Sequence, residues 1–306
     1  MRKPRALQSG DRVAIVAPAS PFSRDSFERG VAAIRELGFE PVWDESVFAR
    51  QGYEAGSADV RARAFVEAWH DPSVGAILAA RGGYGSVHLL PLLSRELLQS
   101  SPKLFIGYSD TTALLTWLTV GCGIPALHGP MLDQRLSRGA DGVHLDSFLR
   151  ALRAEPLGPL EPPGLSVLRA GEATGPLYGG NLTQLAASLG TPYAFQPPEG
   201  AVLFLEDVNE RPYRIDRMLT QLRLAGVLSH ARAIVWGDMP GCDEPAGSPG
   251  VRDTVRDLLD GFPGPVLYGF PSGHTLGAAW TLPLGVQVRV EARGVARLVV
   301  EESAVA

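Results

Sequence analysis

Cysteine is scarce in this chain: only Cys122 and Cys242 occur among 306 residues. Two cysteines are too few for a disulfide framework at this length, and without CxxC spacing or a nearby histidine cluster they argue against a zinc site. An excess of positive charge is also missing, because the formal net charge is −5. We therefore expect neither nucleic acid nor a membrane surface as a partner.

Long apolar runs are missing as well. Polar residues 8–12 interrupt the N-terminal stretch, and the apolar run "VAIVA" after them is too short for the central region of a signal peptide. The longest weakly polar stretch, residues 113–127, contains Gly121, Gly123 and Pro125 and is too short to span a bilayer. These features favour a soluble protein of the cytoplasm.

Glycine and proline are abundant, with 35 and 25 residues, which favours many tight turns over long helices. In the first half, short apolar runs alternate with stretches of helical periodicity. The runs at residues 12–18, 41–43, 74–80 and 103–108 predict strands, and a helix is expected from about residue 110 to 118. Such alternation is typical of parallel strands joined by right-handed crossovers, so we expect an open, mostly parallel α/β domain.

The pattern changes near residue 155. Residues 156–174 are rich in proline and lack periodicity, which is typical of a linker between domains. Apolar runs at residues 201–206, 233–237, 265–270 and 286–300 then predict strands, the last as a hairpin around Arg293-Gly294. We therefore predict an α/β domain at residues 1–155, a linker at 156–174 and a smaller, β-rich domain at 175–306.

One short segment, "LFIGYSDTT", places Ser109 where a predicted strand passes into a predicted helix. Serine is a preferred helix N-cap, so a capping role alone would explain it. The same place is also that of a nucleophile elbow, although the second glycine of the G-x-S-x-G motif is absent. Ligands bind at the carboxyl ends of parallel strands, so this position also suits a nucleophile. Both interpretations, helix cap and nucleophile, stay open.

A glycine-rich turn, "ARGGYGS" at residues 80–86, follows another predicted strand. Its backbone N–H groups suit an anion or an oxyanion, but the residues after it match neither a P-loop nor a dinucleotide-binding motif. A plain tight turn is the alternative. Arg81 in this turn is a candidate for binding a substrate carboxylate, or it forms an ordinary ion pair.

A serine nucleophile needs a base and an acid that orients the base. His274 lies in the loop "GFPSGHTLGA" after a predicted strand, where a histidine has few packing reasons to be. His128 is a second histidine that can line a cleft. Glu206 ends the apolar run "AVLFLE" and is followed by Asp207, so either carboxylate could serve, or both are ordinary charges at a strand end.

Seven segments taken in order resemble the LD-carboxypeptidase family of serine peptidases, which includes the murein tetrapeptide carboxypeptidases. They are "GDRVAIVAPASP", "ARGGYGSVHLLPLL", "FIGYSDTTALL", "HGPM", "GGNLTQLAASLGTPY", "LFLEDVNERPYRIDRMLTQL" and "SGHT…TLPLG". The resemblance implies a Ser-His-Glu triad, with Ser109 as nucleophile, His274 as general base and Glu206 as orienting acid. It also implies an oxyanion hole formed by the backbone N–H groups of Gly83 and Asp110.

The resemblance further implies an active site between the two domains, a homodimer, and no metal or other cofactor. The expected reaction is release of the terminal D-alanine from a murein tetrapeptide. An exopeptidase must bind a free carboxylate, for which Arg81 is the candidate, and Asn181 is a candidate for binding polar groups of the substrate. Two alternatives stay open: an immunity peptidase that cleaves peptide-nucleotide antibiotics of the microcin C type, and a binding protein without catalysis.

Overall fold

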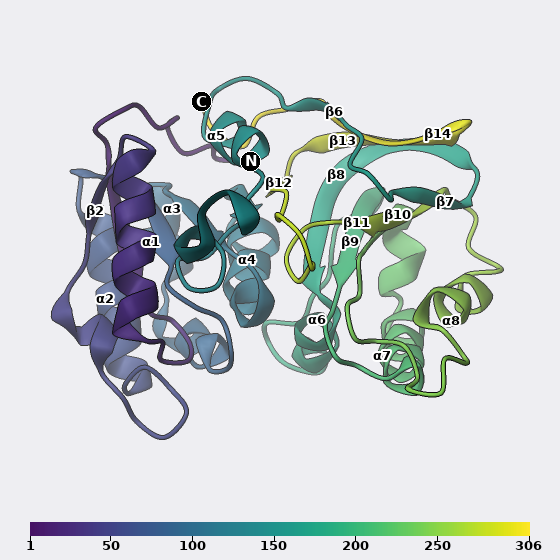
Figure 1. Ribbon diagram of the computed structural model, residues 1–306, viewed down its shortest axis with the longest axis horizontal. Coiled ribbons are helices and arrows are strands. Elements are labelled where there is room, and N and C mark those ends of the chain that lie inside the picture. Colours follow the sequence, from purple (N-terminus) through teal and green to yellow (C-terminus); the bar gives the residue numbers. More distant parts are fainter.

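The computed structural model describes residues 1–306 and consists of two domains placed side by side (Figure 1). The first domain contains a six-stranded sheet with the order β12-β5-β4-β3-β1-β2, in which every pair except β12 with β5 is parallel. Its strands are β1 (Arg12–Val16), β2 (Glu40–Val42), β3 (Val74–Ala79), β4 (Leu104–Gly107), β5 (Ala126–His128) and β12 (Leu282–Leu284).

Helices connect these strands, as the alternating pattern predicts. Ser23 and Ser57 cap the two longest, because each hydroxyl accepts a backbone N–H of the first turn. The helices and 3-10 turns of this part are α1 (Arg24–Glu36), η1 (Glu45–Phe48), α2 (Ala58–His70), η2 (Ser86–Leu92), α3 (Arg95–Ser100), η3 (Ser109–Thr111), α4 (Thr112–Thr116), η4 (Trp117–Gly121), η5 (Leu136–Asp141) and α5 (Leu145–Ala151). The helix expected at residues 110–118 is thus present, but it begins as a 3-10 turn and ends as a π-turn.

The second domain contains an eight-stranded mixed sheet with the order β6-β14-β13-β8-β9-β10-β11-β7. Its strands are β6 (Gly158–Leu160), β7 (Ser166–Arg169), β8 (Gly171–Asn181), β9 (Ala201–Glu206), β10 (Ala231–Gly237), β11 (Val266–Phe270), β13 (Gln287–Arg293) and β14 (Val295–Val300). Its helices are α6 (Leu182–Ser188), α7 (Pro212–Leu224), η6 (Val227–His230) and α8 (Val251–Leu258). The expected fold class, an open and mostly parallel α/β domain followed by a β-rich domain, is confirmed, and the sheet of the second domain is mixed.

Side-chain alternation along β9 shows how the second domain is layered. Leu203 and Leu205 pack in a core of 23 residues with apolar side chains of α6, α7 and α8. Val202 and Phe204 point to the opposite face and belong to a core of 62 residues that also contains the strands of the first domain. The core of 62 residues is therefore continuous across both domains.

Residues 156–174, expected to be a linker, form β6 and β7 and enter β8 instead. Both strands lie at edges of the sheet, the positions where strands tolerate proline. A flat eight-stranded sheet would separate its edges by roughly 34 Å, whereas residues 161–165 can span only about 21 Å. The sheet is accordingly curled, and β7 contacts β13 and β14 near the other edge.

Strands β8 and β12 have no clear signal in the sequence. Two glycines of β8 allow close packing: a side chain at Gly179 would collide with the carbonyl of Phe204 in β9, and one at Gly180 would collide with Thr112. β12 comes from the second half of the chain and completes the sheet of the first domain (Figure 1). The termini also meet, since Ala306 and Pro4 are joined by a backbone hydrogen bond. No helix combines the length and the apolar character needed to cross a membrane.

Candidate active site

Ser109 lies directly beyond the carboxyl end of β4, in a strained backbone conformation. Its φ of 63° is in the left-handed region, which non-glycine residues rarely adopt and which often marks a functional site. No hydrogen bond involves its hydroxyl, and the following turns have no side-chain cap, so the capping interpretation is wrong. The hydroxyl remains available for other chemistry.

The glycine-rich turn after β3 packs directly against Ser109. A Cβ at Gly82 would lie 2.9 Å from Cβ of Ser109 and 3.4 Å from the backbone N of Asp110, so only glycine permits this approach. Gly83 has a φ of 101°, and a side chain there would collide with Ser20. The backbone of this turn therefore lies beside the candidate nucleophile.

Asp110 uses its carboxylate to hold the same turn. The buried carboxylate accepts backbone N–H groups from Ser86 at 2.9 Å and Gly85 at 3.3 Å, and the Asp110 carbonyl accepts the Ser86 hydroxyl at 2.7 Å. Burial outweighs these hydrogen bonds and raises the pKa of Asp110 above its ordinary value. The residue after Ser109 thus links the two loops that would form an oxyanion hole.

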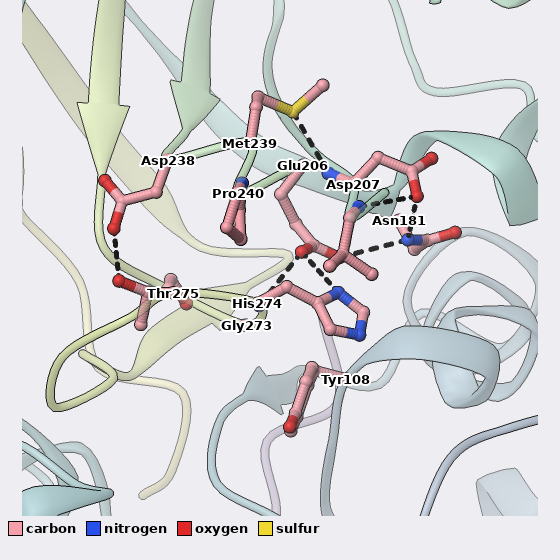
Figure 2. Close-up of polar contacts among 12 residues, drawn as sticks. Tyr108, Asn181, Glu206, Asp207, Asp238, Met239, Pro240, Gly273, His274 and Thr275 are labelled. Carbon is pink, nitrogen blue, oxygen red and sulfur yellow. Dashed lines mark hydrogen bonds and ion pairs between the residues drawn. The ribbon is translucent and has the colours of Figure 1, made fainter. Parts of the chain in front are cut away.

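Buried Glu206 and partly exposed His274 form a hydrogen-bonded pair at the carboxyl edge of the second sheet (Figure 2). The Glu206 side chain is fully buried, and its Oε2 accepts Nδ1–H of His274 at 2.8 Å and the backbone N–H of His274 at 3.0 Å. Burial by itself would raise the pKa of Glu206 and lower that of His274. The mutual attraction of the pair is stronger, so the pKa of Glu206 is lowered and that of His274 is raised.

A glycine allows His274 to reach Glu206. Gly273 has a φ of 75°, and a Cβ there would lie 2.6 Å from the His128 ring and 3.0 Å from the Glu206 carboxylate. In Figure 2 the imidazole Nδ1 points to Glu206 and the other ring nitrogen points away from it. This arrangement assigns the proton to Nδ1 and leaves Nε2 free to accept one.

Asn181 supports Glu206 from the end of β8. Its Nδ2 donates to Glu206 Oε1 at 3.3 Å and to Asp207 Oδ1 at 3.1 Å, and its Oδ1 caps α6 by accepting the backbone N–H of Gln184. Asp207 also accepts both N–H and O–H of Thr183. Burial, followed by the charge of Glu206, raises the pKa of Asp207 to about 6. No hydrogen bond or ion pair joins Asp207 to His274, so Glu206 alone hydrogen-bonds the imidazole.

His128, the other candidate histidine, lies at the end of β5 and is completely buried. Its Nδ1 pairs with the Ser272 hydroxyl at 2.8 Å, and its Nε2 has no hydrogen-bond partner. Burial lowers its pKa to about 4 despite the nearby charge of Glu206. His128 is therefore neutral near pH 7 and packs behind Glu206.

Tyr108 and Arg135 join the two domains around His274. The rings of Tyr108 and His274 meet edge to face with 5.1 Å between centroids, and Tyr108 directly precedes Ser109. The buried Arg135 guanidinium donates to the carbonyls of Gly273 at 2.6 Å and Thr275 at 2.9 Å, on either side of His274. No hydrogen bond joins Ser109 to His274; the Tyr108 ring, next to Ser109 in the chain, is what contacts the imidazole.

A cleft of about 450 Å³ opens over Tyr108 and His274 at this boundary. It is lined by residues of both domains, and none of them is an aspartate or a glutamate. Arg81 does not line it. Its Nε lies 3.6 Å from the Asp133 carboxylate, and its Nη1 donates to the Pro21 carbonyl at 3.1 Å. The sequence did not single out Tyr108, Arg135 or the cleft-lining Arg138.

Comparisons with known proteins identify the family of the chain. The N-terminal domain of LD-carboxypeptidases matches residues 13–129, and the C-terminal domain of LD-carboxypeptidases matches residues 174–290. The chain belongs to the LD-carboxypeptidase family. The resemblance noted from the sequence is therefore confirmed, and the family is one of serine-type hydrolases.

Relatives in the LD-carboxypeptidase family carry two kinds of name. The chain is 33% identical to the probable murein peptide carboxypeptidase of Bacillus subtilis, over 89% of this chain and 86% of that protein. It is 32% identical to the murein tetrapeptide carboxypeptidase of Pseudomonas aeruginosa, over 86% and 88%. The microcin C7 self-immunity protein MccF in complex with aspartyl sulfamoyl adenosine superposes with a TM-score of 0.90 at 26% identity, over 99% of both chains.

Proposed function

We propose that this LD-carboxypeptidase is a serine carboxypeptidase that releases the terminal D-alanine of murein tetrapeptides by cleaving the L,D-peptide bond. Ser109 is the nucleophile, His274 the general base and Glu206 the orienting acid. One observation carries the proposal: the fully buried Glu206 carboxylate accepts Nδ1–H of His274 at 2.8 Å, beside a cleft. The Tyr108 ring packs against His274 in that cleft, and Tyr108 directly precedes Ser109, whose backbone is strained and whose hydroxyl makes no hydrogen bond.

The proposed reaction follows from these groups. His274 Nε2 takes the proton of Ser109 as its Oγ attacks the carbonyl carbon of the scissile bond. Glu206 holds the imidazole tautomer and stabilises the imidazolium that forms. The imidazolium then gives its proton to the departing nitrogen of D-alanine, and water hydrolyses the acyl-enzyme by the same steps in reverse order.

The proposed oxyanion hole consists of the backbone N–H groups of Gly83 and Asp110. Such donors are typically worth about 3–4 kcal/mol each in the transition state. The hydrogen bonds between the Asp110 carboxylate and the backbone of Gly85 and Ser86 support this role, because they fix the glycine turn relative to Ser109. Donors that are held in place before the reaction need no reorganisation during it.

A murein peptide is the better supported substrate of the two that the relatives suggest. Proteins commonly bind nucleobases by stacking them on aromatic side chains. Tyr108 is the one phenylalanine, tyrosine or tryptophan that lines the cleft, and it is only 3% exposed. We further propose a homodimer in the cytoplasm, where murein tetrapeptides would be recycled.

The decisive experiment incubates the purified protein with UDP-MurNAc-tetrapeptide and, separately, with an aspartyl-adenylate analogue. We expect mass spectrometry to show the loss of one alanine from the tetrapeptide. Ser109→Ala is the matched control, and it must abolish that loss if the peptide is cleaved at this site. Cleavage of the nucleotide analogue alone would instead favour an immunity peptidase similar to MccF.

A further inference from the structure

The cleft over His274 has an unbalanced charge. Besides His274, the charged side chains that line it are Arg135 and Arg138, with no carboxylate among them. A peptide with a free C-terminus carries one negative charge close to the bond that an exopeptidase cleaves. The cleft is therefore suited to that end of a peptide, and the question is which cation meets it.

Arg135 is already committed to the protein backbone. Its two terminal nitrogens donate to the carbonyls of Gly273, Thr275 and Gly277. Its side chain is buried, and it packs 5.8 Å from the Tyr108 ring centroid. A guanidinium with these contacts would have to release the His274 loop in order to bind a carboxylate.

Arg81, the carboxylate anchor expected from the sequence, is committed as well. Its guanidinium faces Asp133, a nearly buried carboxylate that also accepts the Ser26 hydroxyl at 2.5 Å. Arg81 also lies outside the lining of the cleft. Its charge is thus neutralised at a different place.

Arg138 has neither restriction. It makes no ion pair and no side-chain hydrogen bond, it is exposed, and it lines the cleft with His274. Its backbone N–H donates to the Arg135 carbonyl at 3.0 Å, so the residue that clamps the His274 loop also holds the backbone of Arg138. Gly142 closes this turn so tightly that a side chain there would collide with the same carbonyl.

We propose that Arg138 binds the terminal carboxylate of the peptide substrate and so makes the enzyme an exopeptidase. A guanidinium presents two parallel N–H groups that match the two oxygens of a carboxylate. This inference rests on the proposed peptidase function and names the group that would restrict it to the end of a chain. Arg138 is thus a specificity-determining residue outside the proposed triad.

The test compares two peptides on several variants. The peptides are the murein tetrapeptide and the same peptide ending in D-alanine amide, which lacks the negative charge. We expect the wild-type protein to prefer the carboxylate by about 10- to 100-fold in kcat/KM, the size of a charge-assisted hydrogen-bonded pair. In Arg138→Gln, kcat/KM for the carboxylate peptide should fall to about that for the amide, so the preference is lost, while Arg138→Lys should recover part of it.

Arg81→Gln is the competing variant. It should keep the full preference for the carboxylate, since its guanidinium is paired with Asp133. A preference that survives in Arg138→Gln, or one that disappears in Arg81→Gln, would overturn the assignment of Arg138. The two variants have the same change of charge and side-chain size, so the comparison isolates position.

Binding measurements keep this inference distinct from the proposed reaction. If the wild-type protein cleaves neither peptide, the peptidase function fails, and the peptides are titrated calorimetrically into the Ser109→Ala protein with and without Arg138→Gln. Tighter binding of the carboxylate that depends on Arg138 would still support the anchor. Equal binding of the two peptides, or no binding of either, would contradict it.

Discussion

The two sheets supply different parts of one site, and they do so by different physical means. In the first domain, Ser109 and the glycine turn at residues 82–85 follow neighbouring parallel strands, β4 and β3. In the second, Asn181 and Glu206 end parallel strands β8 and β9, and His274 follows β11. Carboxyl ends of parallel strands form the binding edge of such sheets, and here two of these edges face each other.

The difference lies in what holds each half. Ser109 is positioned by its strained backbone, with a φ of 63°, and by the close packing of the glycine turn against it. Charge and hydrogen bonds place His274, through buried Glu206 on one side and Arg135 of the first domain on the other. We therefore expect substitutions around Ser109 to alter activity through geometry. Substitutions around His274 should also alter the pH dependence of activity.

The largest effect is expected from Ser109→Ala. Loss of the nucleophile should reduce turnover by roughly 10³- to 10⁶-fold, and a non-catalytic binding protein would show no hydrolysis to lose. The measurement is kcat on the tetrapeptide, with circular dichroism to verify folding. Hydrolysis that persists at the wild-type rate would remove Ser109 from the mechanism.

The two histidines should differ strongly. His274→Ala should lose activity nearly as completely as Ser109→Ala, because the proposed general base is gone. His128→Ala should change kcat by less than about tenfold and destabilise the fold by about 1–3 kcal/mol, since that ring fills a buried space. The comparison needs kcat and urea unfolding for both variants, and an inactive, well-folded His128→Ala would show that the base is misassigned.

Glu206→Gln should change both the rate and its pH dependence. The base must be unprotonated at Nε2, so activity falls as pH falls through the His274 pKa, and the raised pKa places this limb above 6.5. Without the charge of Glu206, burial dominates and lowers that pKa, so the limb should move to lower pH. The plateau should drop by about 10²- to 10⁴-fold. An acid limb that stays in place would mean that Glu206 does not set the pKa of His274.

Arg135 should affect the rate much less than the proposed triad residues do, and its variants test the bridge between the domains. Arg135→Lys keeps the charge but loses the planar fork that reaches three carbonyls, so we expect roughly a 10-fold loss of kcat with an unchanged acid limb. Arg135→Met also removes a positive charge that lowers the pKa of His274, so its acid limb should move upward in pH. Identical pH profiles in the two variants would reduce Arg135 to a packing role.

Much of this organisation could be predicted from local patterns in the sequence. Buried runs identify strands because they are short and apolar. Every residue of "VGAILA" in β3 is apolar, and so is every residue of "AVLFLE" in β9 before the final Glu206. The order of motifs identifies the family, and the loop composition around His274 marks it as a functional candidate. The proposed triad residues could thus be named without coordinates.

Other elements had no such pattern because long-range contacts create them. Gly179 of β8 is explained only by the closeness of β9, and Pro159 of β6 only by the edge position of its strand. The same limit applies to arginines: Arg81 stands in a conspicuous motif, yet Asp133 occupies its guanidinium, while nothing local distinguishes Arg138. Partners distant along the chain decide which charges stay free.

The sequence by itself therefore determined which residues carry reactive groups and at which strand ends they occur, because periodicity and turn composition are local properties of the chain. Only the tertiary structure decided which of them meet. It pairs Glu206 rather than Asp207 with His274, buries His128 as a neutral ring, and brings Tyr108 against His274 across the domain boundary. These outcomes depend on burial and on the distances between charges, and both exist only after the two sheets have packed together.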